Sequence, residues 1–191
     1  MKESYLLLGW SLYFYLHSLL AATAVKQYFT EFFSIKSART YRIGYNLFAL
    51  TGLLLLLWLQ FIIRSELLFI TSFISDCFAF FIMIAGLVIM FAAIQNYDWK
   101  SFIGITKEKK YALVIAGMNK YVRHPLYSGT MLFAAGFLVW QPYYKNLFLF
   151  LLMWIYLSLG IIFEERKLVK IYGDEYKIYQ KKVKKMIPFI W

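Results

Sequence analysis

The stretch SDCFAFFIMIAGLVIMFAAIQ, residues 75–95, decides the fold class. After Asp76 it contains no charged side chain. A helix that crosses the hydrocarbon core of a bilayer needs about 20 consecutive, mostly apolar residues. The stretch therefore predicts a membrane-spanning helix with Asp76 at its outer end. It also holds Cys77, the one cysteine of the chain, which excludes an internal disulfide and is predicted to be a buried, unreactive thiol.

Four more apolar runs predict further spans, at 5–25, 44–63, 127–140 (with some extension) and 147–163. The composition agrees, because 62% of the residues are hydrophobic and only 16% are charged. A soluble domain carries about 25% charged residues, so the excess apolar surface is expected to face lipid. The predicted fold class is an all-α polytopic membrane protein with about five transmembrane helices and a C-terminal amphipathic helical segment, forming a single domain over residues 1–191.

The distribution of positive charge predicts the orientation. A net charge of +11 alone would also suit a nucleic-acid-binding protein. The basic residues instead alternate with the spans, so no nucleic-acid partner is expected. One set of loops carries every Lys and Arg except Lys2, Arg64 and Lys145. By the positive-inside rule the N-terminus lies outside and the C-terminus in the cytoplasm, with cytoplasmic parts at 96–126 and 164–191.

The polar run KYVRHPLYSG, residues 120–129, stands directly before the fourth apolar segment. Proline favours the first turn of a helix, so Pro125 predicts a helix start. Such a start directs free N–H groups and the positive end of the helix dipole toward the cytoplasm. Together with Arg123 and His124, it suits a carboxylate or another anion. Taken alone, this run favours the simpler interpretation, an arginine that only anchors a helix to lipid headgroups.

A second polar cluster follows the fifth span. Glu164 and Glu165 end an apolar helix on the inner side. Anions there are favoured neither by the helix dipole nor by anionic lipids, so a cationic partner is implied. Consecutive helical residues lie about 100° apart. One glutamate can therefore face a pocket while its neighbour pairs elsewhere, with Arg123 as the candidate.

The C-terminal segment has an aromatic stripe with helical spacing, formed by Tyr172, Tyr176, Tyr179 and Val183, opposite several lysines. It predicts an amphipathic helix in the inner headgroup region, and Gly173 is a candidate break before it.

Polar groups also lie within the first two spans. His17 is either a substrate-side group or a histidine bonded to another helix, and Asn46 and Gln60 are predicted interhelical hydrogen bonds. No Cys, His or Asp cluster has the spacing of metal ligands, so no metal is expected.

RHPLYSG followed by EERKLVKIYGDEYKIYQKKVKKMIP resembles the isoprenylcysteine carboxyl methyltransferase and phospholipid methyltransferase superfamily, over about the C-terminal half. Its members are integral membrane enzymes that use S-adenosylmethionine. The pattern is R-H-P-x-Y-x-G, then E-E-x-x-L, then G-x-x-Y-x-x-Y and a late I-P, and this sequence contains every element. The resemblance implies a cofactor site formed by Tyr111, Ala112, Leu113, Val114, Asn119, His124, Pro125, Leu126, Tyr127 and Glu164, with Arg123 and Glu165 near the reacting centre. Asn119 departs from the tyrosine of many relatives.

The N-terminal half resembles bacterial methanethiol S-methyltransferase-like relatives, a likeness that includes His17 and Asn46. It favours a small or lipophilic methyl acceptor, and a location in a bacterial inner membrane. Gly160 stands where the prenylcysteine enzymes carry an arginine implicated in substrate binding, which argues against a prenylcysteine carboxylate. The predicted function is a membrane-embedded S-adenosylmethionine-dependent methyltransferase. The alternatives are a reductase of sterol-reductase-like architecture and a non-enzymatic transport or assembly protein.

Overall fold

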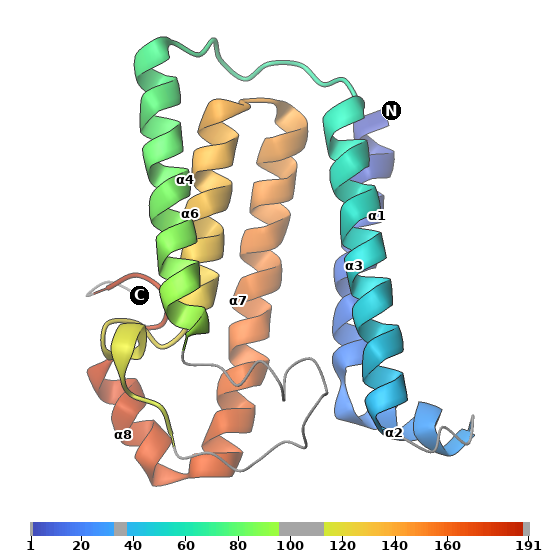
Figure 1. Ribbon diagram of the computed structural model, residues 1–191, viewed down its shortest axis with the longest axis vertical. Coiled ribbons are helices and arrows are strands. Elements are labelled where there is room, and N and C mark those ends of the chain that lie inside the picture. The colour runs from blue at the N-terminus through green and yellow to red at the C-terminus, as the bar shows by residue number, and fades with distance from the viewer. Residues whose placement is uncertain (1, 33–37, 96–112, 189–191) are drawn as a thin grey trace. The chain divides into compact units, whose positions relative to one another are not determined.

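The computed structural model describes residues 2–32, 38–95 and 113–188, and in these ranges its regular elements are helices (Figure 1). The described residues divide into two compact units, one ending at Ser65 and the other beginning at Glu66. The all-α class is therefore confirmed for the described part of the chain.

The first unit contains α1 (Lys2–Ala21), α2 (Thr23–Phe32) and α3 (Ala38–Ile62). The sequence predicts one helix over 5–25, but the chain bends at Ala22 and continues as α2. The break falls where the apolar run gives way to a mixed segment with Lys26, Gln27 and Glu31. The end of the predicted span at residue 25 was wrong, because α2 is a separate amphipathic helix.

Polar bonds link α1 to α3 inside the first unit. The buried Trp10 donates its indole N–H to Oε1 of the buried Gln60 at 2.8 Å. This confirms the interhelical hydrogen bond predicted for Gln60. The Tyr13 hydroxyl donates to the carbonyl of Ala49 at 2.9 Å.

The second unit contains α4 (Phe73–Ile94), the 3-10 turn η1 (Gly117–Lys120), α6 (Pro125–Trp140), α7 (Tyr144–Tyr172) and α8 (Asp174–Lys182). In Figure 1, α4, α6 and α7 stand side by side, and α8 follows the end of α7. The closest approach is between α4 and α6. A Cβ at Gly86 would lie 2.7 Å from the carbonyl oxygen of Gly129. Glycine at both positions is what allows the two backbones to touch.

Two local features set where helices of the second unit begin and end. Ser72 and Ser75 form a capping box at the start of α4, which satisfies N–H groups that a helix start leaves open. Gly173, at φ 59°, separates α7 from α8. That left-handed conformation favours glycine, and the predicted break at Gly173 is confirmed.

Within the described residues, three helices are long and apolar enough to cross a membrane: Thr40–Ile62 in α3, Phe73–Ile94 in α4 and Tyr144–Tyr172 in α7. These make the chain an integral membrane protein. The apolar α6 has 16 residues, about 24 Å of helix, which is shorter than a hydrocarbon core of about 30 Å. The count of five spans therefore stays a prediction. The predicted burial of Cys77 was wrong, because its side chain is exposed on a helix whose apolar surface suits lipid.

Candidate active site

The RHP stretch is held by the C-terminal segment. Val122 forms a parallel bridge with Lys184. The backbone N–H of Arg123 donates to the Lys184 carbonyl at 2.8 Å, and that of His124 to the Lys185 carbonyl at 2.9 Å. These bonds place the start of α6 against residues some sixty positions later in the sequence. The helix begins at Pro125, as predicted.

Arg123 uses its whole guanidinium group inside this arrangement. Its Nε donates to Oε1 of Glu165 at 2.7 Å, and its Nη2 lies 2.6 Å from the same oxygen. Its Nη1 donates to the carbonyl of Gln180 at 3.0 Å and to that of Val183. The pair predicted for Arg123 and Glu165 is therefore present. It joins the start of α6, the polar end of α7 and the end of α8.

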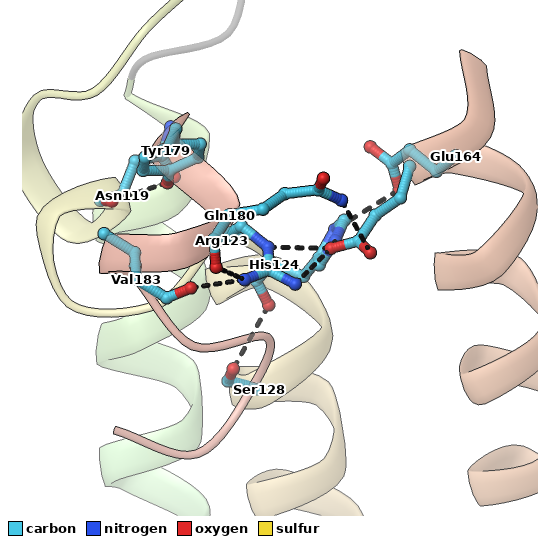
Figure 2. Close-up of polar contacts among 9 residues, drawn as sticks. Asn119, Arg123, His124, Ser128, Glu164, Tyr179, Gln180 and Val183 are labelled. Carbon is cyan, nitrogen blue, oxygen red and sulfur yellow. Dashed lines mark hydrogen bonds and ion pairs between the residues drawn. The ribbon is translucent and has the colours of Figure 1, made fainter. Parts of the chain in front are cut away.

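His124 contacts both glutamates, and Figure 2 shows it together with Glu164. Its Nε2 is 3.3 Å from Oε1 of Glu165, and its Nδ1 is 3.5 Å from Oε2 of Glu164. The histidine is buried, whereas the Glu164 side chain is 35% exposed. Gln180 donates its amide N–H to the other oxygen of Glu165 at 3.2 Å. Glu165 is therefore saturated by protein groups, and Glu164 keeps an accessible side.

An aromatic face adjoins this pair. The rings of His124 and Tyr127 stack with centroids 5.6 Å apart and planes 9° from parallel. The Tyr127 side chain also interacts with the Glu164 carboxylate. The first intrahelical bond at this end runs from the N–H of Ser128 to the carbonyl of His124. The N–H groups of Leu126 and Tyr127 precede this bond, in the first turn of the helix.

The tyrosines of α8 complete the second unit around the cluster, which is formed by Arg123, His124, Glu164 and Glu165. Tyr179 donates its hydroxyl to the carbonyl of Asn119 at 2.6 Å, and the Asn119 amide donates to the carbonyl of Val114 at 3.0 Å. Tyr176 is buried, and its hydroxyl has no hydrogen-bond partner among the described residues. Burial raises the pKa of the Tyr179 hydroxyl to about 12 and also raises that of Tyr176, so both hydroxyls stay neutral at physiological pH.

The remaining predicted site residues are placed as follows. Leu113 and Val114 lead into η1, whereas Tyr111 and Ala112 lie outside the described residues. His17 and Asn46 belong to the first unit. There, His17 Nε2 is 2.9 Å from the Tyr45 hydroxyl, which matches the expectation of a histidine bonded to another helix. Asn46 is half-buried on α3. The roles predicted for all these residues stay predictions.

Three contact residues were missed by the sequence reading: Gln180, Val183 as a carbonyl acceptor, and Ser128, whose hydroxyl donates to the Met186 carbonyl at 2.6 Å. Their contacts follow from the pairing of 122–124 with 184–185, which has no local sequence signal. Among the residues that the structure describes, no group of three His, Cys, Asp or Glu could hold a metal ion.

The protonation of His124 gives a prediction for stability against pH. Burial disfavours its charge, but the bonds to Glu164 and Glu165 outweigh burial and raise the pKa of His124 above 6.5. A raised folded-state pKa stabilises the protein fully below the unfolded pKa of about 6.5, and this stabilisation is lost as pH rises through the folded value. The melting temperature in detergent is therefore expected to fall as pH rises above about 6.5. A decrease of about 1 kcal/mol in the free energy of unfolding lowers the melting temperature by about 2–4 °C in chains of this size.

The two histidines of the chain provide a matched comparison for this measurement. His124→Gln is expected to flatten the dependence of melting temperature on pH in that window. His17→Gln is expected to keep it. An equal slope in wild type and His124→Gln would contradict the charged His124 between two carboxylates.

One family model and several known proteins are similar to this chain. The family model described as NnrU protein matches residues 5–191. A Protein-S-isoprenylcysteine O-methyltransferase of Schizosaccharomyces pombe is 35% identical over 94 residues, which is 49% of this chain and 40% of that protein. Methanethiol S-methyltransferase 1 of Bradyrhizobium diazoefficiens is 27% identical over 183 residues, 91% of this chain and 62% of that protein. Methanethiol S-methyltransferase of Crocosphaera subtropica is 26% identical, over 91% of this chain and 70% of that protein.

The chain thus spans less than two thirds of the first two of these relatives. No solved structure matches it.

Proposed function

The chain belongs to the NnrU protein family, within the isoprenylcysteine carboxyl methyltransferase-like superfamily of membrane methyltransferases, and from that premise we propose that it moves a methyl group from S-adenosylmethionine to a small or lipophilic acceptor. The observation that carries the proposal is the contact of His124 with Glu164 at the start of α6, beside the Tyr127 ring. Methyltransferase names among the relatives support the reaction class.

The polar and aromatic groups of this site suit the three charged groups of S-adenosylmethionine, which are an ammonium, a carboxylate and a sulfonium. The accessible side of Glu164 suits the ammonium. The N–H groups of Leu126 and Tyr127 suit the carboxylate, since a helix start binds anions. The stacked faces of His124 and Tyr127 suit the sulfonium through a cation–π contact. The buried Tyr176 hydroxyl, which has no partner in the described part of the chain, leaves a donor for a bound group.

When bound, the cofactor supplies a methyl group on a positively charged sulfur. The residues of the chain hold and orient the reactants, because positioning is the main contribution that a protein makes to such a displacement. Arg123 and Glu165 fix His124 next to the reacting centre. The other cofactor contacts that we propose come from Pro125 and from Tyr111, Ala112, Leu113, Val114 and Asn119.

For the acceptor we propose a thiol, a carboxylate or a lipid group, with His17 and Asn46 on its side of the protein. The two units act as one methyltransferase domain with five spans in a bacterial inner membrane. The N-terminus lies outside and the C-terminus, with the cluster, in the cytoplasm. The charge asymmetry of the loops supports this orientation.

A transfer assay tests the proposed reaction. Detergent-solubilised protein, methyl-labelled S-adenosylmethionine, and either small thiols or a lipid extract of bacterial membranes are incubated together. Label is expected in an acceptor. His124→Ala and Glu164→Gln are each expected to slow the transfer at least tenfold, because a hydrogen bond to a charged group contributes about 1.5–3 kcal/mol.

Lys167→Gln, an exposed position on the same helix, is the matched control and is expected to transfer label at the wild-type rate. A reductase would instead bind a nicotinamide cofactor and transfer no label. A transport or assembly protein would transfer none and would keep its function in both variants. Either result would overturn the proposal.

A further inference from the structure

A groove of about 510 Å³ adjoins the cluster and is lined by α7, by Gln180 of α8 and by the segment that follows α8. Its walls combine three cations with apolar side chains: Arg166, Lys170, Lys185, Ile162 and Val169. Arg166 and Lys170 are exposed, and Lys185 is half-buried. The groove is therefore a basic pocket with an apolar side, at the polar end of a membrane-spanning helix.

The acid in this groove does not cancel its charge. Glu165 also lines it, but one of its oxygens contacts Arg123 and His124 and the other accepts from Gln180. The negative charge of Glu165 is thus compensated by Arg123 and His124 of the cluster. The groove therefore carries a net positive charge, with Arg166 and Lys170 exposed at its wall.

An exposed apolar stripe on α7 runs directly into the groove. Its members are spaced by three or four residues and are all exposed: Leu151, Ile155, Leu159 and Ile162. Arg166 and Lys170 continue the same stripe one and two turns later. At 100° per residue, these positions fall within an arc of about 100° on one face of the helix. The face is therefore apolar along the span and basic at its end.

We propose that this face binds one anionic phospholipid of the bilayer, with an acyl chain along the apolar stripe and the phosphate in the groove. Basic pockets at the ends of membrane helices bind acidic headgroups in this way, and the long stems of Arg and Lys allow their charges to reach the headgroup level. The site does not depend on the proposed methyl transfer. Its cations, Arg166 and Lys170, take no part in the cluster around His124.

Native mass spectrometry of the protein in detergent micelles tests the proposal with two lipids, dioleoylphosphatidylglycerol and dioleoylphosphatidylcholine. One phosphatidylglycerol is expected to bind at least tenfold more tightly than phosphatidylcholine. The double variant Arg166→Gln, Lys170→Gln is expected to weaken it at least tenfold. The matched control removes two exposed cations of α8 outside the groove, Lys181→Gln with Lys182→Gln, and is expected to stay within twofold of wild type.

Three results would overturn the lipid site. They are equal weakening in both double variants, equal affinity for the two lipids, and displacement of the lipid by glycerol phosphate at the same concentration, which would mark a site for soluble anions. If circular dichroism shows that the groove variant is not folded, Lys170→Glu takes its place with the same expectation. Binding of S-adenosylhomocysteine to the groove variants is expected to be unchanged, so a failed lipid site and a failed cofactor site give different results.

Discussion

Arg123→Gln is expected to lower the free energy of unfolding by about 3–5 kcal/mol, the usual effect of removing one partner from a buried ion pair. The side chains of Arg123 and Glu165 are only 6% and 13% exposed. The substitution would leave the Glu165 carboxylate without its main partner. It would also remove the donor to the carbonyls of Gln180 and Val183. The same change therefore loosens the contact between α6, α7 and the C-terminal segment.

Thermal unfolding in detergent, followed by circular dichroism, measures this effect. Arg123→Lys is expected to fall between wild type and Arg123→Gln, because lysine keeps the charge but cannot reach Glu165 and both carbonyls from one planar group. Lys120→Gln removes an exposed cation three residues earlier and is expected to match wild type. A melting temperature of Arg123→Gln within about 1 °C of wild type would contradict the role of this pair.

Gly129→Ala is expected to destabilise the protein by about 1–3 kcal/mol, the typical cost of overpacking a well-packed contact. The added Cβ would lie 2.6 Å from Cγ of Met90 and 2.7 Å from the carbonyl oxygen of Gly86. The second of these is backbone, so α4 and α6 would have to move apart. The loss occurs although alanine is the better helix former by about 1 kcal/mol.

Gly160→Ala separates packing from helix propensity. Its Cβ would meet nothing within 4 Å, so only the propensity gain remains and the melting temperature is expected to rise slightly. Gly86→Ala is expected to behave like Gly129→Ala, because its Cβ would lie 2.6 Å from the backbone nitrogen of Phe133. If all three alanine variants are equally stable, α4 and α6 do not touch at these glycines.

Local signals predicted much of the second unit. The apolar run at 75–95 predicts α4 (Phe73–Ile94) to within two residues at each end, because a span of that length has few alternatives. Pro125 marks the start of α6, since its fixed φ suits the first turn. The expected helix end at Glu164 and Glu165 was wrong, because α7 continues to Tyr172. The cationic partner expected for one of these glutamates is present, since the structure pairs Glu165 with Arg123.

Other features had no signal in the sequence. The pairing of Val122 with Lys184 uses backbone groups that every residue carries, so no side-chain pattern in the sequence predicts it. The positions of Gln180 and Tyr176 beside Arg123 and Glu165 depend on that pairing. Cys77 was expected to be buried because it is apolar, but in a membrane protein apolar residues also face lipid, so hydrophobicity does not predict burial there.

Isothermal titration of S-adenosylhomocysteine into the detergent-solubilised protein is the most direct test of the cofactor site, since it needs no knowledge of the acceptor. The expected result is saturable binding at one site per chain, weakened at least tenfold by Glu164→Gln and unchanged by Lys167→Gln. A folded wild-type protein that binds neither S-adenosylhomocysteine nor S-adenosylmethionine would contradict the assignment of His124, Tyr127 and Glu164 as a cofactor site.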